Sequence, residues 1–233
     1  MLSIITINKD NCKGLQKTIE SLSNLDERQY QWICIDSASS DGSVELANQF
    51  KTQDDVVISE KDTGIYNAMN KGILHAKGDY VRFLNSGDTL SPHIHSLGFM
   101  DLVVDHDLAL FGFQIRSMER KPRSNAWRFW SMPTSHQAII YSTSLLRKHS
   151  FNETYRFAAD FEHYLRINQS HLKIYRDERA LIVNEPYGSD SHLPVLLNEY
   201  RMALVQNGYP KLWANFVYWL KTYYLKWALR ERS

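Results

Sequence analysis

Short apolar runs alternate with amphipathic stretches along the first half of the chain. The apolar runs have the length of buried strands, whereas residues such as Ile65, Met69 and Ile73 recur at the spacing of one helix face. Gly78 follows that helix and has the position expected of a left-handed residue after a helix end. The pattern predicts strands at residues 2–7, 32–35, 56–59 and 80–84, helices at residues 12–22, 43–50 and 63–77, and a further helix that Ser91 and Pro92 open.

The rhythm loosens after residue 105. Residues 117–135 have no clean period and mix Arg, Lys, Pro and Trp, which predicts a long mobile loop. From residue 190 the chain changes character, and two helices are predicted around a break at residues 207–210. We therefore expect an α/β domain at residues 1–189 and a helical extension at residues 190–233. The remaining predicted elements are strands at residues 108–115, 138–141, 172–175 and 180–183, and helices at residues 160–167, 192–206 and 212–230.

Strands that alternate with helices favour a mainly parallel central sheet with right-handed crossovers and helices on its faces. In open sheets of this kind, ligands bind beyond the carboxyl ends of the strands. Polar side chains gather at those ends here, which predicts a site along one edge of the sheet. The polar residues at or just beyond the ends of the first four predicted strands include Thr6, Asn8, Asp36, Glu60, Asp62 and Asp88.

Composition narrows the class of protein. The formal net charge is +1, so no overall positive field calls for a nucleic-acid partner. Two cysteines, Cys12 and Cys34, make no disulfide framework, and we expect a reducing cytoplasm. No run of about 18 apolar residues is present, and the first residues lack the basic flank and cleavage site of a signal peptide. The mean hydropathy of −0.42 agrees with a soluble protein.

Several segments together resemble bacterial family 2 glycosyltransferases. They are SIITINK, IDSASSDGS, EKDTGIYNAMNKG, GDYVRFLNSGD, SHQAIIY and RFAADFEHYLR, and the resemblance covers about residues 2–185. It implies a GT-A-type, Rossmann-like fold and inverting transfer of a sugar from a UDP-sugar donor. It also implies an acceptor saccharide linked to a polyprenyl diphosphate, in the assembly of capsule, O-antigen or exopolysaccharide.

The resemblance also implies roles for the polar residues at the sheet edge. Asp36 would accept the imide N–H of uracil, although the same acid can cap the turn that follows. Asp62 would lie near the ribose or orient Lys71, and Lys71 would contact a diphosphate oxygen unless it is a solvated surface lysine. Glu60 and Asp62 also favour the dipole of the next helix. The predicted nucleotide-sugar contacts are Thr6, Asn8, Asp36, Asp62, Lys71 and Asn85.

A metal site is implied at residues 85–88. Family members carry Asp-x-Asp-Asp or Asp-x-Asp at this turn, whereas this chain has Asn85-Ser86-Gly87-Asp88 and keeps only the last acid. One carboxylate still suits Mn²⁺ or Mg²⁺, because Mg²⁺ keeps several waters and takes other ligands from phosphates. The family pair His136-Gln137 adds His136 as a second metal or acceptor contact. The structural alternatives are a turn aspartate and a core histidine.

Asp160 is the predicted catalytic base. The family places its catalytic acid in this stretch, where Asp160 precedes an apolar helix. Partial burial would raise the pKa of Asp160 towards a value useful for deprotonating a sugar hydroxyl. Capping of the helix is the alternative role for Asp160, and Glu162 is the rival base.

The last helix carries an aromatic stripe and a basic surplus. Five basic residues stand against one acid in residues 211–233, a net charge of +4. Aromatic rings flanked by Lys and Arg are typical of helices that lie in a membrane interface. We therefore expect a peripheral position on the cytoplasmic face of the inner membrane, and packing on the same domain or on a second subunit is the alternative. The stripe comprises Trp213, Phe216, Val217, Leu220, Tyr223, Tyr224 and Trp227.

Two other functions remain open at this point. A nucleotidyltransferase that makes a nucleotide sugar can use a related sheet, but the first strand leads into Asn8-Lys9-Asp10-Asn11 and not into a glycine-rich phosphate loop. A non-catalytic subunit that binds nucleotide sugars would explain the depleted acidic turn.

Overall fold

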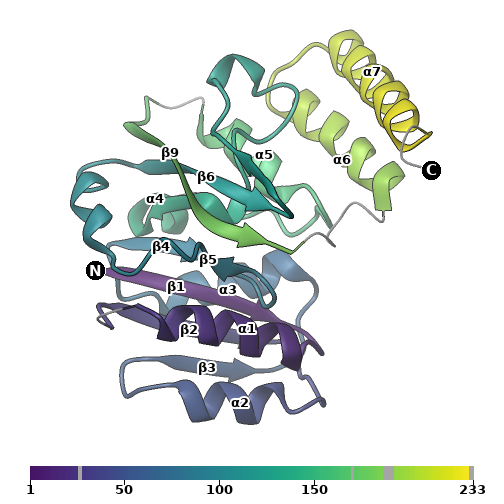
Figure 1. Ribbon diagram of the computed structural model, residues 1–233. Coiled ribbons are helices and arrows are strands. Elements are labelled where there is room, and N and C mark those ends of the chain that lie inside the picture. The colour runs from purple at the N-terminus through teal and green to yellow at the C-terminus, as the bar shows by residue number, and fades with distance from the viewer. Residues whose placement is uncertain (26–27, 169–170, 186–191, 231–233) are drawn as a thin grey trace.

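The computed structural model describes the chain except for residues 26–27, 169–170, 186–191 and 231–233. In the N-terminal half, strands and helices alternate as the hydrophobic pattern predicts (Figure 1). These elements are β1 (Leu2–Asn8), α1 (Cys12–Ser23), β2 (Tyr30–Asp36), α2 (Ser43–Phe50), β3 (Val56–Ser59), α3 (Ile65–His75) and β4 (Tyr80–Phe83).

The second half combines short strands, 3₁₀ turns and four helices within the described residues. The strands are β5 (Thr89–Leu90), β6 (Leu108–Ile115), β7 (Met118–Arg120), β8 (Ile139–Ser142) and β9 (Ile174–Asn184). The helices are α4 (Thr143–Lys148), α5 (Ala159–Ile167), α6 (Leu193–Gln206) and α7 (Lys211–Arg230), with 3₁₀ turns at Gly98–Leu102, Asn125–Trp127 and His136–Ala138.

The strands form one mixed sheet in the order β3-β2-β1-β4-β8-β6-β9-β5, with β7 paired to β6. Strands β1 to β4 are parallel, β8 is antiparallel to both β4 and β6, and β9 is parallel to β6. Asn8 pairs with Asp36, and Asp36 pairs with Ser59. The predicted polar residues therefore share one edge of the sheet.

Side chains of the central strands alternate between two cores. Ile5 on β1 packs with Met69 of α3 on one face, whereas Ile4 packs with Leu15 of α1 on the other. Because both faces are covered, β1 and β2 are buried along their whole length. This explains why they read as continuous apolar runs and not as alternating ones.

The structure differs from the prediction at two places, the helix predicted to begin at Ser91 and the two short strands predicted near the end of the α/β domain. Ser91 opens no helix, since Leu90 pairs with Ile182 of β9 and the Ser91 N–H donates to Leu181 O. The two strands predicted at residues 172–175 and 180–183 are one strand, β9, whose register against β6 shifts near Gly112.

Gly78 is present for close packing and not for a left-handed backbone. Helix α3 ends at His75, and Gly78 is absent from the glycines with positive φ. A Cβ atom on Gly78 would lie 2.7 Å from the Met1 carbonyl oxygen. The glycine therefore lets the turn before β4 approach β1.

The loop predicted at residues 117–135 is partly structured, because it contains β7, which pairs with β6.

The helical extension is packed onto the α/β domain. Ala203 and Leu204 of α6, with Ala214 and Val217 of α7, belong to the same buried cluster as α3 and α5. Val217 is the buried member of the predicted stripe; the side chain of Trp227 lies outside the described residues. No helix in the described part of the chain is long and apolar enough to cross a bilayer.

Candidate active site

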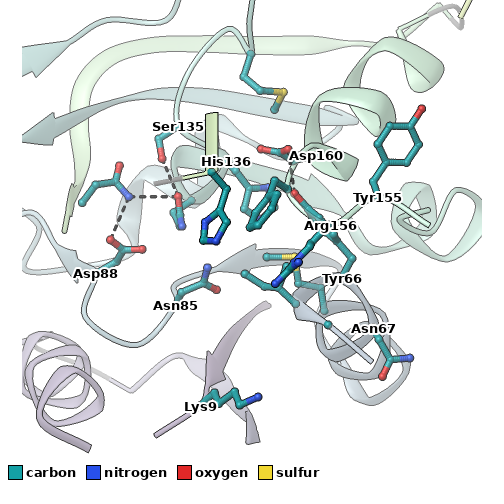
Figure 2. Close-up of a pocket in the computed structure, with 18 of the residues that line it drawn as sticks. Lys9, Tyr66, Asn67, Asn85, Asp88, Ser135, His136, Tyr155, Arg156 and Asp160 are labelled. Carbon is teal, nitrogen blue, oxygen red and sulfur yellow. Dashed lines mark hydrogen bonds between the residues drawn. The ribbon is translucent and has the colours of Figure 1, made fainter. Parts of the chain in front are cut away.

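An open cleft of about 1210 Å³ lies beyond the carboxyl ends of β1 and β4 (Figure 2). Its walls come from the start of α3, the turn after β4, residues 132–137 and residues 153–160. Asp88 and Asp160 lie on opposite sides of His136 in this view. The sequence-predicted residues that line the cleft are Asp62, Asn85, Asp88, His136 and Asp160.

Asp160 lies in the first turn of α5 and faces the cleft. Its Oδ1 accepts hydrogen bonds from the Tyr66 hydroxyl at 3.2 Å and from the Phe161 N–H at 2.8 Å. Burial raises the pKa of Asp160 to about 6, with a smaller contribution from the charge of Glu199, while the two hydrogen bonds oppose the rise. A carboxyl group with that pKa is ionised near neutral pH and still basic enough to accept a proton in a transition state.

Glu162, the rival base, lies outside the cleft. Its side chain is buried and forms an ion pair with Arg166, with 2.8 Å between Arg166 Nε and Glu162 Oε1. This arrangement removes its carboxylate from any bound acceptor.

Asp88 ends a tight turn on the other side of the cleft. Gly87 has a φ of 103°, which favours glycine, and the turn brings Asp88 against the end of β9 and the residue that follows it. Asp88 Oδ1 accepts hydrogen bonds from the Glu185 N–H at 2.8 Å and from Asn184 Nδ2 at 3.2 Å. Burial raises the pKa of Asp88 to about 6, and the two hydrogen bonds from Glu185 and Asn184 oppose this rise, with a smaller opposing effect of the Arg82 charge.

His136 and Asn85 complete this side of the cleft with unpartnered polar atoms. Both ring nitrogens of His136 and the Oδ1 of Asn85 are buried without a hydrogen-bond partner among the described residues. The His136 ring stacks on Phe83 at 5.0 Å, and burial lowers the pKa of His136 to about 4. The imidazole is therefore neutral at pH 7, as a metal ligand must be.

These three residues fit a divalent cation that takes most of its ligands from a bound diphosphate. A carboxylate, an amide oxygen and a neutral imidazole are acceptable ligands for Mn²⁺ or Mg²⁺. No group of three or more His, Cys, Asp or Glu side chains gathers in a metal-binding arrangement within the described ranges. A protein-only metal cage is thus absent from that part of the chain.

Four predicted nucleotide-sugar contacts lie outside the cleft lining: Thr6, Asn8, Asp36 and Lys71. The Thr6 hydroxyl is buried and accepts a hydrogen bond from Trp32 Nε1 at 3.0 Å, so it has a structural partner. Lys71 does not pair with Asp62. Its Nζ lies 2.6 Å from Glu60 Oε1, whereas Asp62 Oδ1 accepts from the Gly64 N–H at 3.0 Å.

Asn8 and Asp36 form a buried pair at the sheet edge. Asp36 Oδ1 accepts hydrogen bonds from Asn8 Nδ2 and the Ser39 hydroxyl, and Oδ2 accepts from the Ser39 N–H and the Ser59 hydroxyl. Desolvation works to raise the pKa of Asp36, but these four bonds outweigh it and the pKa is lowered. Asn8 Oδ1 is buried and unpartnered by any described residue.

Comparison with known proteins decides the family. The sequence profile described as Glycosyl transferase family 2 matches residues 3–163. This chain belongs to glycosyltransferase family 2.

Curated relatives of this family 2 chain are named glycosyltransferases. An uncharacterized glycosyltransferase of Mycobacterium tuberculosis is 38% identical over 91 residues, which are 39% of this chain and 35% of that protein. The putative teichuronic acid biosynthesis glycosyltransferase TuaG of Bacillus subtilis is 30% identical over 91 residues, which are 38% of this chain and 36% of that protein. The match therefore spans about a third of the length of these relatives.

Solved structures confirm the predicted fold. TarS 1-349 of S. aureus superposes with a TM-score of 0.67 at 15% identity, over 93% of this chain and 69% of that chain. The mannosyltransferase PcManGT of Pyrobaculum calidifontis, in complex with GDP-Man and Mn²⁺, has a TM-score of 0.68 at 15% identity, over 92% and 68%. The family 2 chain thus has the GT-A-type α/β fold.

The sequence reasoning missed two cleft residues of this family 2 site. Tyr66, which bonds Asp160, and Arg156, which lines the cleft, were not singled out. Both lie inside segments that carry the family resemblance, EKDTGIYNAMNKG and RFAADFEHYLR. Their place in those segments was the available signal.

Proposed function

We propose that this protein is an inverting glycosyltransferase that moves a sugar from a UDP-sugar to a saccharide acceptor. The observation that carries the proposal is the division of the cleft. One side holds a partly desolvated carboxylate, Asp160, tied to Tyr66. The other side holds Asp88, Asn85 and a neutral His136. A base and a site for a leaving diphosphate therefore face one space.

The acceptor side follows from Asp160. An acceptor hydroxyl within hydrogen-bond reach of the carboxylate gives up its proton to Asp160 as its oxygen attacks the anomeric carbon. The bond from that carbon to the UDP oxygen breaks on the opposite face, and UDP leaves with the electron pair. Attack from one face and departure from the other invert the anomeric configuration.

The donor side follows from the turn at Asp88. Asp88, Asn85 and His136 would hold a divalent cation, Mn²⁺ or Mg²⁺. Such a cation, when bound, stabilises the negative charge that develops on a departing diphosphate. We assign the nucleotide base to the ends of β1 and β2, where Asp36 holds the Asn8 amide by a hydrogen bond. Asp62, at the cleft wall, is assigned to the ribose.

The comparisons support a UDP-sugar donor. TarS of S. aureus was crystallised with UDP-GlcNAc, and glucosyl-3-phosphoglycerate synthase of Mycobacterium tuberculosis with UDP and Mn²⁺. The name of TuaG supports a role in surface polysaccharide biosynthesis. We propose a polyprenyl-diphosphate-linked saccharide as acceptor.

An acceptor of that kind places the enzyme at the cytoplasmic face of the inner membrane. Support comes from α7, whose outer face exposes large side chains. Trp219 is 62% exposed and stacks on Tyr223, which is 64% exposed. Aromatic rings with a polar edge are suited to the lipid headgroup region.

The direct test measures release of UDP or GDP from a panel of UDP-sugars and from GDP-mannose, with Mn²⁺ and Mg²⁺ present. We expect UDP release from at least one UDP-sugar. Pyrophosphate release from UTP and a sugar phosphate would instead reveal a nucleotidyltransferase. Tight UDP-sugar binding with no turnover on any acceptor would identify a non-catalytic binding subunit.

A further inference from the structure

A single carboxylate from the helical extension holds the backbone just before the predicted base. Glu199 Oε1 accepts the Arg156 N–H at 2.8 Å, and Oε2 accepts the Phe157 N–H at 2.8 Å and the Ala158 N–H at 2.9 Å. Helix α5 begins at Ala159, and its N-cap residue Ala158 has no side chain that can accept a hydrogen bond. Glu199 of α6 therefore supplies from outside the acceptor that the start of α5 lacks.

Two further contacts fix the same stretch to α6. On the N-terminal side of residues 156–158, the Tyr155 hydroxyl donates to Gln206 Oε1 at 2.6 Å. On the C-terminal side of residues 156–158, the Phe161 ring stacks on Tyr200 with 4.1 Å between ring centroids. Asp160 thus lies inside a segment that α6 holds on both sides.

Glu199 itself does not reach the substrate space. It is 9% exposed and is not among the residues that line the cleft, whereas Arg156 and Asp160 both line it. Its three acceptor bonds are made to backbone N–H groups, and a charged acceptor makes such bonds stronger than neutral ones. Glu199 can therefore act on the reaction in two ways, through the backbone of residues 156–158 and through its charge, which makes a small contribution to the raised pKa of Asp160. Activity measured on the plateau above the acid limb of the pH profile reports the first.

We propose that Glu199 is a positioning residue, which fixes Asp160 and Arg156 relative to the bound donor and acceptor. This inference rests on the proposed transferase function with Asp160 as base. It makes the helical extension part of the catalytic apparatus. The physical reason is that a misplacement of about 1 Å between reacting groups can cost about 10² in rate.

The test is the Glu199→Gln variant. Glutamine replaces one carboxylate oxygen with an NH₂ group, so at least one of the three N–H donors faces another donor. We expect kcat for UDP release to fall by about tenfold or more. The dissociation constant for UDP should stay within about twofold, because the nucleotide is assigned to β1 and β2. Hydrogen exchange of the amides of residues 156–158 should become faster.

Glu162→Gln is the matched control. Glu162 is also a buried glutamate in the same core, 4% exposed, but its partner is the Arg166 side chain. The control should lower the melting temperature at least as much as Glu199→Gln does, while kcat and exchange at residues 156–158 stay close to wild type.

The outcomes separate the two proposals. An unchanged kcat in Glu199→Gln overturns the positioning role. So does an equal loss of kcat in both variants, since that reports general destabilisation of α5. If hydrogen exchange of the amides of residues 156–158 is as slow in Glu199→Gln as in the wild type, Glu199 does not hold this segment, and this result needs no activity data. If the wild type releases UDP from no donor, the proposed transferase function is contradicted. The hydrogen-exchange result still shows whether Glu199 holds the backbone of residues 156–158.

Discussion

Two aspartates in one cleft have raised pKa values for the same physical reason but have different neighbours. Burial dominates for both Asp88 and Asp160. Asp160 is bonded by a neutral tyrosine hydroxyl, whereas Asp88 is bonded by a backbone N–H and an amide and lies near Arg82. For Asp88 the charge of Glu185 raises the pKa and the smaller effect of Arg82 lowers it. A residue beside a neutral donor suits the exchange of a proton.

The Asp160 carboxylate should set the acid limb of the pH profile. The pKa is raised to about 6, and the ionised form is the base, so kcat should rise with pH through about 6 and level off above it. Tyr66→Phe removes a hydroxyl that stabilises the ionised form. Its acid limb should therefore move to higher pH. The measurement is kcat against pH for the wild type, Tyr66→Phe and Tyr30→Phe.

Tyr30→Phe is the control for that experiment, because Tyr30 begins β2 at the end of the strand opposite the cleft, its hydroxyl donates to Leu22 O, and it does not line the cleft. Its limb should match the wild type. An unmoved limb in Tyr66→Phe, with kcat still rising near pH 6, would show that Tyr66 does not tune the base.

Asp88→Asn should cut transfer by about 10²–10³, the range expected when one group that stabilises developing charge is lost. Asparagine keeps an oxygen that can accept the Glu185 N–H, so the turn should stay folded. The measurement is UDP release, with circular dichroism as the check on folding. Turnover near the wild-type rate would contradict the assignment of Asp88, and full wild-type activity in excess EDTA would contradict the cation.

At the scale of elements, α7 presents two different faces. Ala214 and Val217 are buried against the domain, whereas Trp219 and Tyr223 are exposed and stacked on each other. Truncation after Pro210 would remove the buried face as well as the exposed one. Substitutions on the outer face alone therefore test membrane association without opening the core.

The double variant Trp219→Ser, Tyr223→Ser should bind vesicles more weakly by about tenfold or more, because each buried aromatic side chain contributes about 1.5–3 kcal/mol. The measurement is sedimentation with vesicles of anionic phosphatidylglycerol at low and high salt. Leu74→Ser is the control, since Leu74 is 75% exposed on α3. Equal pelleting of the double variant and the wild type would rule out this face as the lipid contact.

The secondary-structure elements differ in how well the sequence could predict them. Strands β1 to β4 are buried on both faces or flanked by helices, so their apolar runs identify them directly. Strand β5 could not be found, because its two residues depend on pairing with β9, more than ninety residues away. The segments that resemble the family singled out Asp88, His136 and Asp160, and all three line the cleft.

The contacts between distant segments of the site could not be predicted, because the local sequence pattern carries no information about them. The bond from Tyr66 to Asp160 joins residues 94 positions apart, and the bonds from the N–H groups of residues 156–158 to Glu199 join the segment before α5 to α6. Of the two roles implied for Asp62, the orientation of Lys71 is not what the structure shows, because Lys71 pairs with Glu60. Glu60 and Asp62 are equally acidic, and only the turn before α3 decides which of them Lys71 reaches.

At the scale of the whole molecule, the sheet brings separate parts of the chain to one edge. Parallel strands β1 and β2 end at the assigned nucleotide position, and the turn after β4 carries Asp88. Helix α6, which begins more than thirty residues after Asp160, holds the segment that carries Asp160. The two sides of the cleft are thus built by different parts of the chain.

The most direct measurement of the central claim compares UDP release and UDP binding in the wild type and in Asp160→Asn. The account predicts that transfer to a competent acceptor falls by about 10²–10⁴, the range for loss of a general base. UDP affinity, measured by calorimetry, should stay within about twofold of the wild type. If Asp160→Asn instead transfers at the wild-type rate, or loses UDP binding while Glu162→Gln loses turnover, the assignment of Asp160 as the base is contradicted.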